Sequence, residues 1–95
     1  MTEKALQGLR IVEYCSMISG PYCTKLMADL GAEVIKIEHP GSGDTARQYP
    51  PFPDSISDPE KSGLFHYLNT NKLGITLNPT QAAGNEIFKK LAELV

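Results

Sequence analysis

The chain has 95 residues, of which 41% are hydrophobic and 21% charged, and its formal net charge at pH 7 is −2. Its nine Lys and Arg residues are scattered and outnumbered by eleven Asp and Glu, so we expect no nucleic-acid-binding surface. No apolar run approaches the roughly 18 residues of a membrane span, and the N-terminus MTEKALQGLR lacks the apolar core of a signal peptide. These properties are typical of a small domain, or a piece of a larger one, in a cytoplasmic protein.

The first part of the sequence predicts a strand, a helix and a second strand. LRIVEY (9–14) and AEVIKIE (32–38) are short and rich in β-branched residues, which favours strands. Between them we expect a helix with Pro21 in its first position and Gly31 as its left-handed C-cap. Such a crossover gives parallel pairing with a right-handed connection. Apolar residues recur at helical spacing inside the expected helix: Tyr22, Leu26, Met27 and Leu30.

Residues 39–61 form a long irregular segment. It holds five of the seven prolines and two of the eight glycines. Loops of this length in compact proteins usually cover a site or a partner. Near its start, beside GSG (41–43), Asp44 and Arg47 are three residues apart, and we expect them to pair and order the loop.

The last third of the sequence predicts a helical turn in 62–72 and a third strand over LGITLN (73–78). A final helix should begin with Asn78 as N-cap, Pro79 in the first position and Gln81 closing a capping box. Its buried face is expected to consist of Ile87, Leu91 and Leu94, flanked by Phe88.

The expected elements amount to an α/β fold with a Rossmann-like parallel sheet. Parallel sheets are normally covered by helices on both faces. Three strands and two main helices leave one face of the sheet largely uncovered. We therefore interpret 1–95 as the N-terminal part of a larger domain.

A dinucleotide site is the first chemical candidate. The turn after the first strand, CSMISGP (15–21), has one glycine and a proline in place of G-x-G-x-x-G, although Glu38 ends the second strand where an acid would bind ribose. Nicotinamide and flavin binding are therefore not expected. A helix N-terminus still presents free amides, so Ser19 and the amides of Tyr22 and Cys23 are candidates to face an anionic or polar ligand.

The remaining reactive side chains give weaker signals. We interpret Cys15 and Cys23 as reduced, buried apolar groups, with a reactive thiolate at Cys23 as the alternative. The two histidines are 27 residues apart with no third ligand at metal spacing, so no metal site is expected. Asn71 and Lys72 allow two interpretations. Either they lie near a phosphate, or Asn71 caps a turn while Lys72 points into solvent.

The chain resembles the N-terminus of the class III CoA-transferases, the group that includes formyl-CoA transferase, carnitine CoA-transferase and α-methylacyl-CoA racemase. The ordered segments that carry the resemblance are LQGLRIVEY, SGPYCTKLMADLGAEVIKIEHPGSGDTAR, SGLFHYLNTNKLGITLN and AAGNEIFKKL. They cover nearly all of 1–95. The resemblance implies the N-terminal part of a CoA-binding Rossmann-like domain. The rest of that domain and a smaller domain would lie outside this chain, and the full-length enzyme would form interlocked homodimers.

The resemblance also implies a binding site for coenzyme A, with no metal. The positions that match the family's contacts are Ile18, Ser19, His39, Leu77, Asn78, Pro79 and Thr80. They follow the three expected strands, and ligands of open α/β sheets bind at the carboxyl ends of the strands. Two departures weaken the match. His39 stands where some members carry an arginine, and a histidine is only partly charged at neutral pH; Leu73 stands where many members have a second basic residue.

The implied activity is transfer of coenzyme A between acyl-CoA thioesters and carboxylic acids through a covalent aspartyl intermediate. In the family the catalytic aspartate lies beyond residue 95, so we expect no catalytic residue here and no activity from the segment alone. Two alternatives stay open. One is an acyl-CoA racemase or isomerase of the same family, which removes and returns the α-proton. The other is a truncated, non-catalytic CoA-binding or interaction module.

Overall fold

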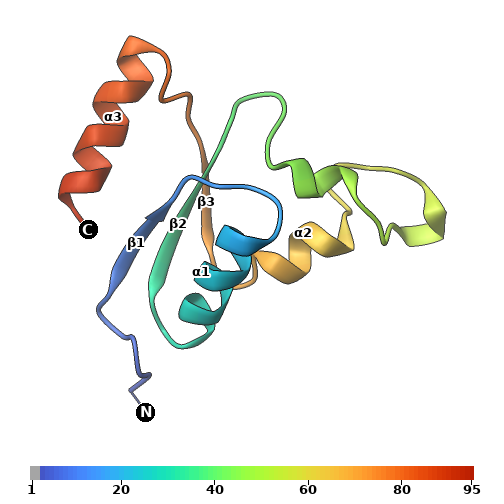
Figure 1. The fold of residues 1–95 in the computed structure, drawn as a ribbon, viewed down its shortest axis with the longest axis horizontal. Helices are drawn as coiled ribbons and strands as arrows, with labels where there is room; N and C mark the ends of the chain where they lie inside the picture. The colour runs from blue at the N-terminus through green and yellow to red at the C-terminus, as the bar shows by residue number, and fades with distance from the viewer. Residues whose placement is uncertain (1–2) are drawn as a thin grey trace.

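The computed structural model describes residues 3–95 and contains a three-stranded parallel sheet in the order β1-β2-β3 (Figure 1). This confirms the predicted parallel strand–helix–strand unit. Within 3–95 no helix combines the length and the apolar character needed to cross a bilayer. The strands are β1 (Arg10–Glu13), β2 (Glu33–Glu38) and β3 (Leu73–Thr76), and the α-helices are α1 (Ser19–Asp29), α2 (Gly63–Leu68) and α3 (Ala82–Glu93).

Helix α1 begins earlier than its proline suggested. Its first residue is Ser19, so Pro21 occupies the third position rather than the first. The missing N–H is tolerated there because the first amides of a helix have no partner inside it. The amide of Tyr22 donates to Ile18 O at 2.8 Å, so the expectation that this amide faces a ligand is wrong. Gly31, with φ of +106°, ends the helical segment as predicted.

The core lies between α1 and one face of the sheet. Of the four apolar positions at helical spacing in α1, only Met27 packs against this core. Tyr22, Leu26 and Leu30 are exposed on the outer side of the helix. Helix α1 instead approaches the sheet through small residues such as Pro21 and Ala28, which are buried. The buried residues of the core are Ala28, Ala32 and Val34, with Leu6, Ile11 and Met27 packed against them.

The other face of the sheet is apolar and largely uncovered in the described part of the chain, although Ile37 on this face is buried. Because successive side chains of a strand point to opposite faces, the residues next to buried Val34 turn away from α1. The strand register then aligns Val12, Ile35 and Leu73 in one row across the sheet. Leu73 is 56% exposed. The expected uncovered face is therefore present.

The prediction for the start of α3 is wrong. Gln81, not Asn78, occupies the N-cap position, and no side chain caps the helix. The side chain of Asn78 instead closes a local turn, in which its Oδ1 accepts from Thr80 N at 3.0 Å. An Asx turn of this kind competes with N-capping for the same oxygen. The helix consequently starts three residues later than the sequence suggested.

The expected buried face of α3 is also wrong. Ile87 and Leu94 are 50% and 65% exposed. The helix stands apart from the sheet at the left of Figure 1. Its aromatic residue Phe88 meets Tyr14 edge-on, with the ring centroids 6.0 Å apart. An amphipathic pattern indicates which side of a helix is apolar, but it does not supply a surface to cover that side.

Segment 39–61 extends as an arm at the right of Figure 1 and contains two short 3₁₀ helices, Thr45–Gln48 and Pro53–Ser55. Buried Ser62, which follows the arm, hydrogen-bonds to the main chain around the first of these 3₁₀ helices. Its Oγ lies 2.8 Å from Ala46 O and 2.7 Å from Tyr49 O, and it also accepts from Phe65 N as the cap of α2. The predicted helical turn in 62–72 is therefore confirmed as α2.

Candidate functional site

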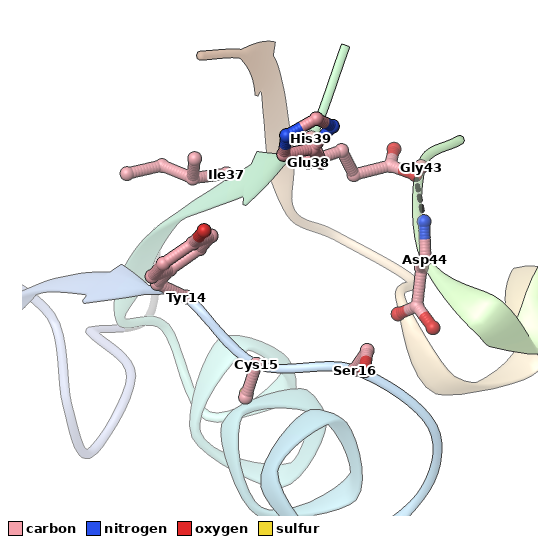
Figure 2. A pocket seen from close by; sticks show the side chains of 8 residues that line it. All are labelled: Tyr14, Cys15, Ser16, Ile37, Glu38, His39, Gly43 and Asp44. Atoms are coloured by element: carbon pink, nitrogen blue, oxygen red, sulfur yellow. Dashed lines mark hydrogen bonds between the residues drawn. The ribbon is translucent and has the colours of Figure 1, made fainter. Parts of the chain in front are cut away.

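The carboxyl ends of the three parallel strands meet at one edge of the sheet, and two pockets open there. The first, which we call the edge pocket, has a volume of about 260 Å³ (Figure 2). Its walls come from the chain leaving β1 (14–16), the end of β2 (37–39) and the turn at 43–44. The second pocket, of about 200 Å³, shares Glu38, His39 and Gly43 with the first and reaches Arg47, Glu60 and Thr76.

Beneath the edge pocket lie four charged side chains, which we call the buried charge cluster: Glu13, Lys36, Asp44 and Lys72. Each of these side chains is at most 2% exposed. Lys36 Nζ lies 2.7 Å from Glu13 Oε2 and 2.8 Å from Asp44 Oδ2. Lys72 Nζ lies 2.7 Å from Glu13 Oε1. Two cations and two carboxylates make the cluster electrically neutral.

The pKa shifts reflect this pairing. Burial raises the pKa of Glu13, but hydrogen bonds from Lys36, Lys72 and Thr24 outweigh it and leave the pKa below its ordinary value. Burial opposes charge on Lys36 as well, yet its close contacts with the carboxylates of Asp44 and Glu13 raise its pKa overall. For Lys72 burial prevails and the pKa is lowered. Desolvation and charge pairing thus act in opposite directions within one cluster.

The two cysteines differ in exposure. Cys15 is half-buried in the wall of the edge pocket, and burial followed by the negative charge of Glu13 raises its pKa to about 11. A thiol with that pKa is protonated at neutral pH and is a poor nucleophile. Cys23 is exposed, so the expectation that both cysteines are buried is wrong for Cys23. Within 3–95 no group of three or more His, Cys, Asp or Glu is placed to hold a metal ion.

Glu38 and Arg47 form a second charged pair between the two pockets. Arg47 Nε and Nη2 donate to the two carboxylate oxygens of Glu38, each at 2.7 Å, and this pairing lowers the pKa of Glu38. The guanidinium also lies 3.7 Å from the ring centroid of Phe65. The predicted Asp44–Arg47 pair is therefore wrong, because Asp44 faces Lys36. Both oxygens of Glu38 are occupied, which leaves it unsuited to the ribose role of a dinucleotide site.

The structure places the predicted ligand contacts on three segments at this edge. Ile18 and Ser19 stand exposed at the start of α1. His39 follows β2 and lines both pockets. Residues 77–80 form the turn between β3 and α3. Of the seven predicted positions, His39 is the one that lines these two pockets, and the role of all seven as ligand contacts stays a prediction.

Two hydrogen bonds bring these segments together. The amide of Met17, next to the predicted contacts at the start of α1, donates to Asp44 Oδ1 at 2.9 Å. The amide of Leu77 donates to Glu38 O at 3.0 Å, which places the third segment beside His39. The three predicted segments therefore converge on the turn that follows β2.

Sequence reasoning missed the residues that support this edge. Lys72 is neither at a phosphate nor in solvent, because its Nζ also donates to Pro21 O at 3.0 Å and Asn69 Oδ1 at 2.8 Å. Asn71 has a φ of +65° and donates to Asp29 rather than to a ligand. One signal was available. Glu13 and Lys36 lie inside apolar strands, and a charge in such a position needs a buried partner.

Comparison with known proteins identifies the class. The model of CoA-transferase family III matches residues 6–95. The chain is 39% identical over 89 residues to succinyl-CoA:mesaconate CoA-transferase of Haloarcula marismortui, covering 94% of this chain and 22% of that protein. It is 40% identical over 92 residues to succinyl-CoA:glutarate CoA-transferase of Mus musculus, covering 96% and 20%. It is 42% identical over 88 residues to formyl-CoA:oxalate CoA-transferase of Escherichia coli, covering 90% and 20%.

Solved structures agree with this assignment. A CaiB/BaiF family protein from Brucella suis superposes with a TM-score of 0.80 at 31% identity, covering 95% of this chain and 24% of that one. A protein from Mycobacterium tuberculosis gives a TM-score of 0.77 at 33% identity, covering 94% and 23%. The chain therefore belongs to CoA-transferase family III. It spans about a fifth of the length of these curated relatives.

Proposed function

We propose that these 95 residues are one segment of the CoA-binding domain of a longer enzyme that transfers coenzyme A from an acyl-CoA to a carboxylic acid. The observation that carries the proposal is the family match over residues 6–95. The three relatives named above support it, since each is named for CoA transfer between two acids. The difference in length supports a longer enzyme, because each relative is several times longer than the chain.

The proposed contacts with coenzyme A are the seven predicted positions at the edge of the sheet. The carboxyl ends of parallel strands are where open α/β sheets bind ligands, and the three segments converge there. Arg47 is already engaged with Glu38 and Glu60. Among the described residues that line the two pockets, this leaves His39 as the basic side chain available to a phosphate. The contacts are Ile18, Ser19, His39, Leu77, Asn78, Pro79 and Thr80.

The proposed chemistry uses an aspartate outside this chain. Its carboxylate attacks the thioester carbonyl and expels the CoA thiolate, which leaves a mixed anhydride. The thiolate then attacks the aspartyl carbonyl of the anhydride, which forms an enzyme thioester and releases the donor acid. The acceptor carboxylate takes the coenzyme by the same steps in reverse. Two of the segment's four aspartates are already engaged in ion pairs. Asp44 is buried against Lys36, and Asp29 is paired with Lys25.

Two further parts of the proposal come from the family resemblance. The complete enzyme forms an interlocked homodimer, and it acts in the cytoplasm on soluble acyl-CoA. Light scattering on the complete enzyme tests the first part, and a monomeric mass contradicts it. Fractionation of cells that express the enzyme tests the second.

The activity is tested by incubating the complete enzyme with an acyl-CoA and a second carboxylic acid, then separating the CoA thioesters by chromatography. Appearance of the acceptor's thioester, with release of the donor acid, supports the proposal. Deuterium incorporation at the α-carbon without a new thioester selects the racemase or isomerase alternative. Saturable CoA binding without either reaction selects the non-catalytic module. The purified 95-residue segment is expected to show no turnover.

The site itself is tested with the two histidines. Both side chains are exposed, and one ring nitrogen of each lies 2.9 Å from a main-chain carbonyl oxygen. His39 Nδ1 contacts Pro40 O, and His66 Nε2 contacts Glu60 O. Only His39 lines the pockets. His39→Ala is therefore expected to weaken CoA binding by about tenfold, as for a lost charge-assisted contact, and His66→Ala should leave it unchanged. Equal affinities in both variants would move the site away from this edge.

A further inference from the structure

The chain leaving β1 is held at every second residue by one buried pair. Lys36 Nζ donates to Glu13 Oε2 at 2.7 Å and to Cys15 O at 3.2 Å. Asp44, paired with Lys36, accepts from Met17 N at 2.9 Å. Residues 13, 15 and 17 are thus fixed to two side chains that come from β2 and the turn after it. Figure 2 shows the carboxylate of Asp44 turned toward the segment of Cys15 and Ser16.

Met17 needs such an anchor because its backbone is strained. Its φ is +68°, a left-handed conformation that non-glycine residues adopt at a cost of about 1–3 kcal/mol. The surrounding structure must supply what keeps it there. The hydrogen bond from its own amide to Asp44 Oδ1 is the direct restraint, and the next two residues are the proposed contacts Ile18 and Ser19.

Asp44 is well placed to provide this restraint. Its side chain is 1% exposed. Oδ1 also accepts from Ala46 N at 2.8 Å, which fixes the carboxylate in the turn. Oδ2 lies at ion-pair distance from Lys36 but accepts no directed hydrogen bond. The carboxylate is therefore held by charge on one oxygen and by two amides on the other.

We propose that Asp44, held by Lys36, is a positioning residue that keeps Met17 left-handed and thereby sets the place of Ile18 and Ser19 in the coenzyme A site. This inference rests on the proposed function. It adds a residue outside the seven proposed contacts and a backbone conformation on which affinity for the acyl-CoA depends. It also gives the neutral buried charge cluster a role beyond stability, because the cluster fixes the shape of the first turn.

The test measures two properties of Asp44→Asn and Asp44→Ala in the complete enzyme. The first is hydrogen exchange at the amide of Met17, which reports the restraint without using the activity. The second is the pair of kinetic constants for the acyl-CoA. Loss of hydrogen bonds to a charged ligand weakens binding by roughly 10- to 100-fold, so we expect KM to rise by about this factor, more in the alanine variant, with kcat changed far less. Asp54→Asn is the matched control, since Asp54 is exposed and lines neither pocket.

A rescue variant separates positioning from general destabilisation. Glycine adopts positive φ without strain. Met17→Gly in the Asp44→Asn background should therefore bring KM most of the way back to the wild-type value. A purely structural role for Asp44 predicts a lower thermal midpoint, an unchanged KM and no rescue, and that result overturns the inference. Faster hydrogen exchange at the Met17 amide in the Asp44 variants with an unchanged KM also overturns it. In that case Asp44 restrains the turn, but the conformation of the turn does not affect binding of the acyl-CoA. Wild-type enzyme that binds no acyl-CoA overturns the proposed function and this inference together.

Discussion

Removing one carboxylate from the buried charge cluster should destabilise the protein far more than removing a surface carboxylate. Glu13→Gln keeps the size and shape of the side chain but removes its charge. In the native structure Glu13 accepts hydrogen bonds from Lys36 at 2.7 Å and from Thr24 at 2.5 Å, and its Oε1 lies 2.7 Å from Lys72 Nζ. After the change the cluster holds two ammonium groups and one carboxylate, and the glutamine amide can point a donor at a cation.

The expected loss follows from burial. The side chain of Glu13 is fully buried and those of its two lysine partners are 2% exposed, so solvent cannot screen the excess charge. Removing one partner of a buried ion pair typically costs about 3–5 kcal/mol. A domain has only about 5–15 kcal/mol of unfolding free energy in total. The variant should therefore lose a large share of its stability.

The measurement is urea unfolding of the complete enzyme, with Glu33→Gln as the matched control. Glu33 pairs with Arg10 at 3.5 Å on the surface, where both side chains are about half exposed, and such pairs contribute about 0–1 kcal/mol. Adding Lys72→Met to Glu13→Gln restores neutrality. The double variant should thus lose less than the sum of the single losses, by about 0.5–3 kcal/mol. Equal midpoints for Glu13→Gln and Glu33→Gln would refute the reasoning.

Three other changes have defined outcomes. Gly84→Ala should cost about 1–3 kcal/mol in urea unfolding because the new Cβ would overlap the main-chain carbonyl of Asn78, whereas a Cβ at Gly74, the control, would meet nothing within 4 Å. Arg47→Lys should cost about 1.5–3 kcal/mol by the same assay, since lysine cannot reproduce the two-point contact with Glu38. Arg47 also holds the pKa of Glu38 below its ordinary value of 4.5. The stability that this carboxylate contributes is therefore complete above about pH 4.5 and is lost as the pH falls further. Thermal midpoints measured across pH should fall less steeply in acid for Glu38→Gln than for the wild type.

Each of these expectations has a contrary result. Similar losses in the two glycine variants would mean that the close approach before α3 does not limit stability. If the Arg47→Lys variant unfolds at the same urea concentration as the wild type, a positive charge at this position is enough, and the two-point contact of the guanidinium with Glu38 adds no stability. Acid profiles that run parallel for the wild type and the Glu38→Gln variant would place the acid sensitivity in other carboxylates.

Local features of the fold could be predicted from the sequence because they depend on neighbours within a few residues. The β-branched run in 32–38 gave a strand, and Gly31 gave a helix end, since only a residue that tolerates φ of +106° fits there. The order of the sequence motifs along the chain also predicted the family. The parallel sheet then followed, because a helix that crosses back from the end of one strand to the start of the next joins strands that run in parallel.

Features that depend on partners far along the chain could not be predicted. Asp44 is three residues from Arg47 but pairs with Lys36, because register and the path of the turn decide which charges meet. Lys72 was expected near a phosphate or in solvent, and it is buried against Glu13, 59 positions away. On the apolar side of α3, Ile87 and Leu94 stay exposed, because a pattern within the helix does not supply a surface to cover them. Sequence by itself determined the elements, their order and the family; only the tertiary structure decided how the buried charges pair, because Coulomb energy depends on distance in space and on the exclusion of water.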